Sequence, residues 1–365
     1  MHITNGRTKR DNTMSANAAK KPSEAPVICL GFDDGNYNSK IAGPNGSLFC
    51  CPSRGRHGQA RTVSLGKKQP DIAEFKVGNK HFSAGAVDSE STMSDVYPVS
   101  ELSRVISHHA LYRAGFAGAT LKIATGLPPR LFFKGDTVDP DQDYIKRKID
   151  NLVGPCELLI ASPEYPDTKK PFELTIVEHQ VAAEGMVAYF HLLLEEMGGN
   201  TTKFHADRQY DPFGFIDFGG RTTDIVVVSN GAVDRARSKS IPHGMLEVRE
   251  MVRSKIKEAY SLRDFSDAAL DRAMTTGKAR LFNVDHDVSE FIVSAKATVT
   301  SLIRDEVYRA FGDGSELSEV VSFGGACVDF ERELRASPWF RHQRTADQPL
   351  YVNALGLYKF IKYIC

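Results

Sequence analysis

Two stretches of the chain decide its fold: VICLGFDDGNYNSK over residues 27–40 and FGFIDFGGRTTDIVVV over residues 213–228. Each has an apolar run that ends in a carboxylate, then small or turn-forming residues, then a second strand-like run. That pattern predicts a β-hairpin. Dinucleotide-binding folds instead place a G-x-G-x-x-G turn between a strand and a helix. Neither that motif nor the G-x-x-x-x-G-K-[ST] loop of P-loop NTPases is found here.

The composition of the two turns is suited to binding an anion. Glycine lets a phosphate approach the backbone closely, and successive backbone N–H groups in such a turn can converge on it. The aspartates at the strand ends, Asp33 and Asp217, would repel a phosphate unless a cation lay between them. They suit Mg²⁺ held largely through water, and Lys40 could donate to the phosphates as a point charge.

A third glycine pair strengthens this interpretation. In EVVSFGGACVDF, over residues 319–330, Gly324 and Gly325 follow a strand pattern and open a predicted helix. Glycine at such a junction lets a base or ribose lie against the backbone. A single D-x-G turn is most often only a hairpin, but the three junctions together favour a nucleotide site.

The remaining patterns predict a mixed α/β chain. Apolar spacing of three and four residues predicts a helix, and short apolar runs bounded by turn residues predict strands. We expect a hairpin at 74–85, a helix at 101–114, a strand at 121–128, a strand at 172–177 that becomes a helix from Glu178 to Gly198, a polar loop at 198–212, helices at about 244–260, 266–274 and 288–311, and a closing helix within 351–365.

Composition excludes several classes of protein. The 365 residues include 46 Lys and Arg and 46 Asp and Glu, so bulk charge gives no reason to expect binding to nucleic acid or anionic lipid. No apolar run is long enough to span a membrane, and the N-terminus lacks a secretory h-region. The six cysteines form no C-x-x-C pair. We expect a soluble, cytoplasmic chain without zinc or redox chemistry.

The charge is unevenly distributed. The polar segment 1–26, which we predict to be a disordered tail, carries five basic residues and one acidic residue up to Lys21. The rest of the chain therefore has 41 basic against 45 acidic residues, a net charge of −4. A slightly acidic body makes direct contact with DNA phosphates unexpected.

The order of these motifs resembles the superfamily of actin, heat-shock chaperone and sugar-kinase ATPases. Within it, the chain is most similar to the plasmid-segregation actins of the ParM/StbA family. That family's first phosphate loop is resembled by FDDGNYNSK, and its second by IDFGGRTTDI. Its helix, strand and Leu-Pro loop are resembled by SHHALYRAGF and LKIATGLPPRLFF. Its nucleoside motif is resembled by SFGGACVDF, and its closing helix by NALGLYKF. The likeness spans about residues 27–360.

The resemblance implies roles for individual residues. Asp33 and Asp217 would lie beside Mg²⁺, and Glu178, with Asp217, would be catalytic, with Glu178 orienting the attacking water. The residues implied to hold the phosphates are Asp34, Gly35, Asn36, Asn38, Lys40, Gly219, Gly220, Arg221 and Thr222. Those implied to border the nucleoside are Gly244, Glu247, Gly324, Gly325 and Ala326.

The resemblance also implies an architecture and a function. We expect a two-domain actin-like α/β fold with ATP (GTP is left open) and Mg²⁺ in the interdomain cleft. Domain I would comprise 27–177 and 351–365, with a subdomain at about 44–98, and domain II would comprise 178–350. ATP hydrolysis would be coupled to self-assembly into filaments that segregate plasmid DNA through a DNA-bound adaptor of ParR type. The alternative is a small-molecule kinase of the same superfamily.

Overall fold

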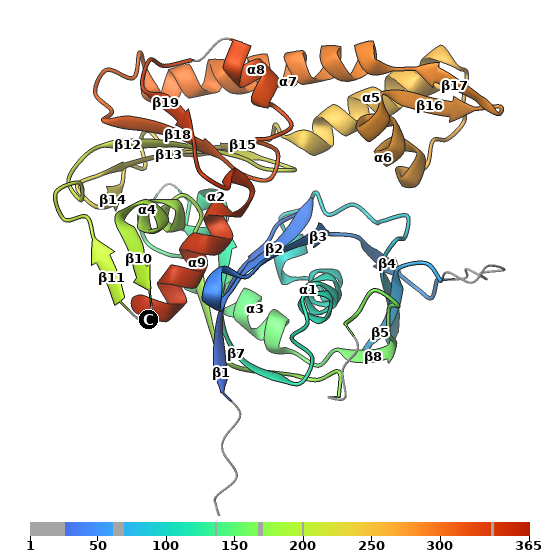
Figure 1. The fold of residues 1–365 in the computed structure, drawn as a ribbon, viewed down its shortest axis with the longest axis horizontal. Helices are drawn as coiled ribbons and strands as arrows, with labels where there is room; N and C mark the ends of the chain where they lie inside the picture. The colour runs from blue at the N-terminus through green and yellow to red at the C-terminus, as the bar shows by residue number, and fades with distance from the viewer. Residues whose placement is uncertain (1–25, 61–68, 136, 167–170, 199–200, 337–338) are drawn as a thin grey trace, which may run out of the picture.

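The computed structural model describes residues 26–60, 69–135, 137–166, 171–198, 201–336 and 339–365. These residues form two halves, each built on a central sheet, which lie one above the other in Figure 1. The tail predicted for residues 1–26 lies almost wholly outside the described residues. No helix among the described segments is long and apolar enough to cross a membrane.

The sheet of the first half has the strand order β3-β2-β1-β7-β9. Its strands are β1 (Val27–Asp34), β2 (Asn38–Ala42), β3 (Leu48–Pro52), β7 (Ala119–Leu127) and β9 (Leu174–Ala183). β1 and β2 form the first predicted hairpin, and β7 and β9 extend the sheet in parallel. The hairpin turn therefore lies at the end of β1 where the parallel strands also end.

Helices cover both faces of this sheet. They are α1 (Glu101–Arg113), α2 (Pro129–Phe132), α3 (Gln142–Val153) and α9 (Val352–Tyr363), with short 3₁₀ turns at Pro44–Gly46, Tyr97–Val99 and Pro349–Tyr351. α9 comes so close to β1 that a Cβ atom on Gly31 would lie 2.0 Å from the carbonyl oxygen of Ala354. The C-terminal helix is thus fixed directly against the strand that leads into the first hairpin.

A small second sheet in the first half has the order β4-β6-β5-β8. Its strands are β4 (Gly55–His57), β5 (Ile72–Val77), β6 (Lys80–Gly85) and β8 (Glu157–Ile160). The predicted hairpin at 74–85 is confirmed as β5–β6. α1 packs Leu102, Val105 and Ile106 against this sheet and Leu111 against the larger one, so one largely buried helix joins the two sheets.

The second half is built on the sheet β14-β13-β12-β18-β19, with β15 paired to β13. Its strands are β12 (Phe213–Phe218), β13 (Thr223–Ser229), β14 (Ala232–Val233), β15 (Lys239–Ile241), β18 (Glu319–Phe323) and β19 (Gln343–Thr345). The run Ile225–Val228 is fully buried because helices cover both faces. β12 and β13 form the second predicted hairpin.

The helices of the second half match the predicted ones closely. They are α5 (Met245–Ala259), α6 (Asp267–Thr276), α7 (Ser289–Phe311) and α8 (Glu331–Ala336), and a two-stranded hairpin, β16 (Lys278–Leu281) and β17 (Val284–Asp287), extends beyond α6. The helix expected directly after Gly324 and Gly325 begins later, because turns occupy residues 324–330.

The helix predicted from Glu178 to Gly198 is wrong. β9 continues to Ala183 because it pairs with β7 along its whole length, and it carries β-branched side chains such as Ile176 and Val181 that favour a strand. The sheet of the first half thus extends six residues beyond the domain boundary expected at 177. The helix is only α4 (Met186–Leu193), which packs on the core of the second half.

The polar loop predicted for 198–212 is also partly wrong. β10 (Leu194–Gly198) and β11 (Thr201–Phe204) form an antiparallel hairpin before the chain enters β12. The closing helix is confirmed as α9. The mixed α/β fold with two halves and a hairpin in each is therefore confirmed, and the main error lies between the two halves.

Candidate functional site

The two hairpin turns meet in a cleft between the halves. Gly220, at the tip of β12–β13, lies so close to Tyr37, at the tip of β1–β2, that a Cβ atom on Gly220 would be 2.3 Å from the Cβ of Tyr37. The predicted residues that line this cleft are Asp33, Asp34, Gly35, Asn36, Asn38, Lys40, Asp217, Gly219, Gly220, Arg221, Thr222 and Gly325. The structure thus brings together the two stretches from which the fold was predicted.

Lys40 on β2 forms a buried ion pair with Asp33 on β1. The distance from Lys40 Nζ to Asp33 Oδ2 is 2.6 Å, and both side chains are 8% exposed. The cross-strand register places the two residues opposite each other. Burial lowers the pKa of Lys40, but the carboxylates of Asp33 and Asp217 outweigh it, so the net pKa is raised. Lys40 therefore supplies a permanent positive charge at the base of the first hairpin.

A second lysine, which the sequence analysis missed, pairs with Asp34. Lys148 on α3 donates from Nζ to both carboxylate oxygens of Asp34, at 2.8 and 2.7 Å, and its side chain is 3% exposed. The pKa of Asp34 is raised because burial outweighs the attraction of Lys148. The sequence does contain a sign of this position. A helical spacing of three and four residues relates Ile145, Lys148, Ile149 and Leu152, so the lysine occupies the inward face of α3.

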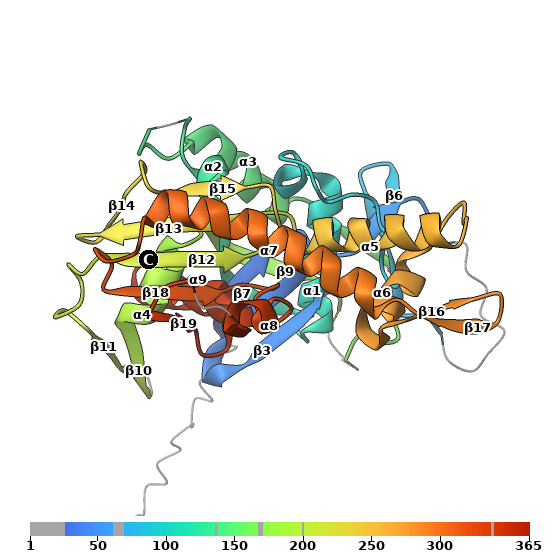
Figure 2. The same ribbon diagram turned by 90° about the horizontal axis from the view of Figure 1, so that it is seen from above.

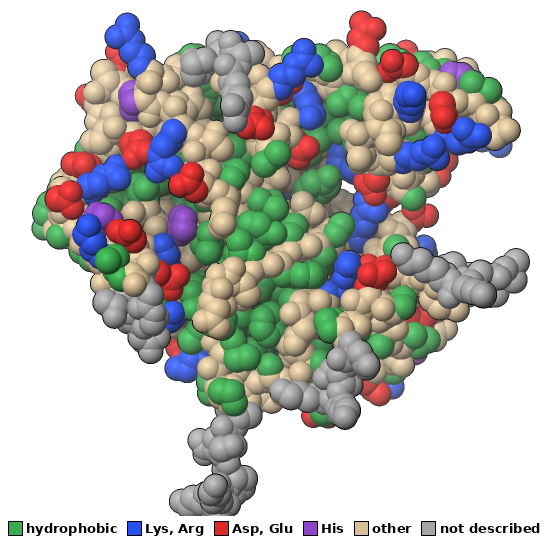
Figure 3. Space-filling view, in the orientation of Figure 1, with side chains coloured by type: hydrophobic (Ala, Val, Ile, Leu, Met, Phe, Trp, Pro, Cys, Tyr) green, Lys and Arg blue, Asp and Glu red, His purple; other side chains and the backbone are tan. Residues whose placement is uncertain are grey.

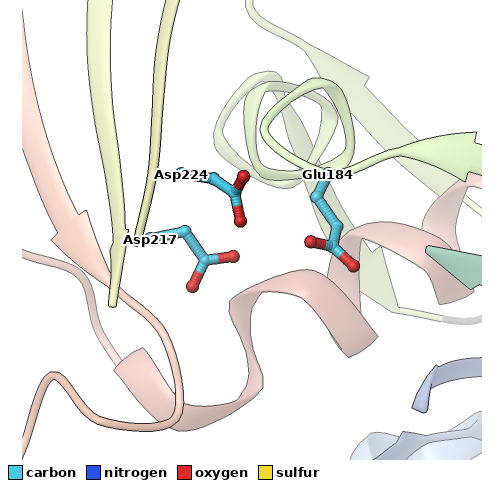
Figure 4. A group of neighbouring side chains, drawn as sticks. All are labelled: Glu184, Asp217 and Asp224. Atoms are coloured by element: carbon cyan, nitrogen blue, oxygen red, sulfur yellow. The ribbon is translucent and has the colours of Figure 1, made fainter. Parts of the chain in front are cut away.

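Three carboxylates from different elements converge beside the second hairpin (Figure 4). Glu184 follows β9, Asp217 is the next-to-last residue of β12 and Asp224 lies on β13. One carboxylate oxygen from each lies within 4.8 Å of the other two. Asn353 on α9 donates to Asp217 Oδ2 at 2.5 Å, and Ser240 donates to Asp224. The second half, the closing helix and the junction after β9 thus build one acidic site.

Burial and mutual repulsion change the protonation of these carboxylates. Burial, with the charges of Asp224 and Asp33, raises the pKa of Asp217 to about 8. Burial raises the pKa of Asp224 to about 6 and that of Glu184 well above its ordinary value. Protons or a cation must therefore balance the charge. An all-oxygen donor set with excess negative charge fits a hard divalent cation such as Mg²⁺.

Glu184 owes its position to glycines on both sides. A Cβ atom on Gly126 of β7 would lie 2.9 Å from Glu184 Oε1, so glycine leaves space for the carboxylate. Gly185, with φ of +82°, turns the chain from β9 into α4. The run Ala182-Ala183-Glu184-Gly185 could have indicated this junction, because small residues and a glycine mark the end of the strand.

The structure does not bring Glu178 to the cleft. It lies in the middle of β9 and forms an ion pair with Lys122 on β7 at 2.7 Å, with the two side chains 28% and 42% exposed. Hydrogen bonds from Lys122 and Gln180 lower its pKa. Glu178 is not among the residues that line the cleft. Its expected place at the start of a helix is taken by Glu184, six residues later.

The residues expected at the nucleoside mostly support the second hairpin. Gly324, with φ of +106°, lies where a Cβ atom would be 2.2 Å from Asp217 Oδ1. Ala326 is buried and donates its N–H to Phe218 O. Gly244 caps α5, whose first N–H groups donate to the carbonyls of Gly219 and Gly220. The Glu247 carboxylate lies 2.8 Å from Nδ1 of His243. Of the five residues expected at the nucleoside, only Gly325 lines the cleft.

Ion pairs cross between the halves around the cleft. Arg221 of the second hairpin and Arg130 of α2 both contact Asp95 Oδ1 at 2.6 Å. Burial alone would raise the pKa of Asp95, but hydrogen bonds from the two arginines lower it. Farther out, Arg54 contacts Asp271 on α6 at 2.5 Å, beside a hollow that is visible between the halves in Figure 3. The two halves are therefore held in contact by charged side chains.

Comparisons with known proteins confirm the fold. Residues 215–336 match the family described as archaeal actin homologue MreB-like, C-terminal. No curated protein matches the chain in sequence.

Three solved structures show the similarity over nearly the whole chain. A 15-stranded ParM filament from Clostridium botulinum has a TM-score of 0.69 at 17% identity, covering 92% of this chain and 99% of that one. Ta0583, an archaeal actin homologue in complex with ADP, has a TM-score of 0.65 at 16% identity, with 91% and 98% covered. The apo pSK41 ParM protein has a TM-score of 0.60 at 15% identity, with 93% and 98% covered. The chain has the two-domain actin-like fold, and the resemblance to plasmid-segregation actins is confirmed at the level of the fold.

Proposed function

We propose that this actin-like chain binds Mg-ATP between its two hairpins, hydrolyses it and assembles into nucleotide-dependent filaments. One observation carries the proposal: the hairpins β1–β2 and β12–β13, from separate sheets, and the carboxylate of Glu184 meet in a single cleft. Two anion-binding turns on opposite walls suit the phosphates of a nucleotide. A carboxylate between them suits a role in cleaving the terminal phosphate.

The phosphates would be held by both turns. Backbone N–H groups of Gly35, Asn36 and Asn38 would serve on one side, and those of Gly219, Gly220 and Thr222 on the other. Lys40 would neutralise phosphate charge, and Arg221 could reach a phosphate if it left Asp95. Mg²⁺ would be held beside Asp217 and Asp33, largely through water, and when bound it would neutralise charge on the phosphates. Gly325 would border the nucleoside.

We assign the water-orienting carboxylate to Glu184 in place of Glu178. An ionised Glu184 would accept a hydrogen bond from a water molecule and orient it toward the γ-phosphorus. The water oxygen forms a new P–O bond, the bond to the ADP oxygen breaks, and the water proton passes to the carboxylate or to the released phosphate. Because burial and the nearby charges of Asp224, Asp33 and Asp217 raise the pKa of Glu184, bound positive charge would favour its ionised, active form.

The structural relatives support the assembly part of the proposal. One of them is itself a ParM filament, and another holds ADP. Closure around the nucleotide would fix the relative orientation of the two halves, and a repeated head-to-tail contact would give an open filament. We propose plasmid segregation through a DNA-bound adaptor of ParR type as the cellular role, which the slightly acidic body of the chain fits better than direct DNA binding.

The test compares two isosteric changes in the same segment. Glu184→Gln should slow ATP-dependent phosphate release by at least about 100-fold, while the protein still binds ATP and sediments with it. Glu178→Gln removes only the exposed ion pair with Lys122 and should turn over at nearly the wild-type rate. Sedimentation and electron microscopy with ATP, a non-hydrolysable analogue and ADP follow assembly.

Two results would contradict the proposal. Equal turnover by Glu184→Gln and wild type would remove the catalytic assignment. A wild-type chain that stays monomeric with ATP but transfers phosphate to an added small acceptor would instead be a small-molecule kinase.

A further inference from the structure

The hairpin β16–β17 carries an aromatic side chain in an unfavourable backbone position. Its two-residue turn consists of Phe282 and Asn283, with φ of +48° and +64°. Such a turn favours glycine, asparagine or aspartate, and a bulky residue with positive φ is an outlier. Phe282 is nevertheless 84% exposed, so its ring is not held there by packing within the molecule. A purely structural role does not account for this side chain.

The charges on the same hairpin are paired. Arg280 contacts Asp285 at 3.2 Å, and Lys278 lies opposite Asp287 in the strand register. The tip therefore presents an uncharged aromatic group on a neutral support, which is the composition of a contact anchor at a protein interface.

The hairpin lies at one end of the long axis of the molecule. Figures 1 and 2 both place β16–β17 at that end and the hairpin β10–β11, with the chain leading into β12, at the opposite end. The opposite end carries Phe204, 47% exposed, and Tyr210, 66% exposed. Four exposed aromatic side chains are found in the described part of the chain, and three of them are at these two ends; the fourth is Tyr308 on α7.

We propose that Phe282 anchors a head-to-tail contact between copies of this chain, packing against Phe204 and Tyr210 of the next copy. This inference rests on the proposed filament and specifies its longitudinal contact. A contact that repeats without closing needs two different surfaces at opposite ends of the molecule, and the aromatic groups provide one at each end. Aromatic anchors of this kind carry a large share of the binding energy at interfaces.

The first test uses a substitution that favours the turn. Phe282→Asn places a residue that tolerates positive φ at the tip, so the melting temperature should stay the same or rise. The critical concentration for ATP-dependent assembly, measured by light scattering, should rise at least tenfold. Val284→Thr, on the same hairpin and 55% exposed, keeps the aromatic ring and should assemble as wild type does. Assembly of Phe282→Asn at the wild-type critical concentration would overturn the inference.

A second test exploits the two unlike ends. The Phe282→Asn variant retains its Tyr210 end, so it should cap growing filaments and slow wild-type assembly when added at a tenth of the wild-type concentration. The double variant Phe282→Asn with Tyr210→Ser lacks both ends and should not slow it. Equal inhibition by the two variants would show that the contact does not pair these ends.

The tests separate this inference from the proposed function. If wild type itself fails to assemble with ATP, the proposed function fails. If wild type assembles and Phe282→Asn assembles equally well, only the head-to-tail anchor fails.

Discussion

At the scale of single residues, the cleft holds more acidic than basic groups. The side chains that face it include five carboxylates and two lysines: Asp33, Asp34, Glu184, Asp217, Asp224, Lys40 and Lys148. Because burial prevents water from screening the charges, each group affects the ionisation of the others. The metal-free cleft therefore retains protons that the unfolded chain would release.

This retention predicts how stability changes with pH. Burial and its acidic neighbours raise the folded pKa of Asp217 to about 8, from an ordinary value of 3.8. Between these values the native state binds a proton that the unfolded state lacks, so the stability decreases as pH rises and levels off above pH 8. Without Mg²⁺, the titration of Asp217 alone should lower the free energy of unfolding by up to about 1.4 kcal/mol per pH unit from pH 6.5 to 8.

Urea unfolding at several pH values checks this prediction, with Asp217→Asn as the comparison. The free energy of unfolding of the variant should fall less steeply over the same pH interval. An equally steep fall in the variant and the wild type would contradict the prediction. The interval begins at pH 6.5 because three buried histidines and one half-buried histidine make stability change in the opposite direction below that pH. Burial lowers the pKa values of His108, His109, His179 and His191 to about 3 or 4. The unfolded chain takes up their protons first, so stability also falls as pH drops below 6.5.

The residue scale also shows how far the sequence could predict the site. Most phosphate-loop residues were found because a turn places its members side by side. Glu184 and Lys148 were missed because their neighbours in the cleft are at least 30 residues away in the sequence. Glu184 lies beside Asp217, and Lys148 pairs with Asp34. A position that depends on tertiary pairing leaves only indirect signs, such as a lysine on the inward face of a helix.

At the scale of secondary-structure elements, the hairpins were predictable and the segment between the sheets was not. A hairpin is specified locally by alternation and turn residues. Residues 178–193 combine the end of β9 with α4, and their apolar spacing satisfies a helix. Pairing of β9 with β7 overrides that spacing, and only the position of β7 in the sheet determines it.

The close approach of the two hairpins gives a prediction at this scale. Gly220→Ala adds a methyl group 2.3 Å from the Cβ of Tyr37, so the turns must separate. We expect ATP affinity, measured by calorimetry, to fall at least about tenfold, since one wall of the phosphate site moves away from the other.

A compensating change provides the control. Tyr37→Gly removes the opposing Cβ atom, so it should restore part of the affinity when combined with Gly220→Ala, although alone it also loses the contact of the ring with Arg249. If the double variant binds no better than Gly220→Ala, the contact between the turns does not determine affinity.

At the scale of the whole molecule, Asp95 connects the two halves. It is held by Arg130 from the first half and Arg221 from the second. Asp95→Asn would leave the arginines facing each other without a counter-charge, so the cleft should open. We expect a larger radius of gyration in X-ray scattering and faster release of a fluorescent nucleotide, by about two- to fivefold for a partly exposed pair.

Asp88→Asn serves as the matched control, because it removes the same charge from an exposed position in the same half. It should leave both measurements unchanged. Nucleotide release from Asp95→Asn at the wild-type rate would show that this ion pair does not hold the cleft closed.

The location of Glu184 has a mechanical consequence. The chain passes from the first sheet to the second after β9 and returns between β19 and α9, and Glu184 is the first residue after β9 on the outgoing passage. A carboxylate at that crossing would shift if the angle between the halves changed. Under the proposed function, tension or compression along a filament would then alter the rate of hydrolysis directly. The crossing would act as a load sensor, through which a resisting cargo could determine how long each subunit keeps its nucleotide.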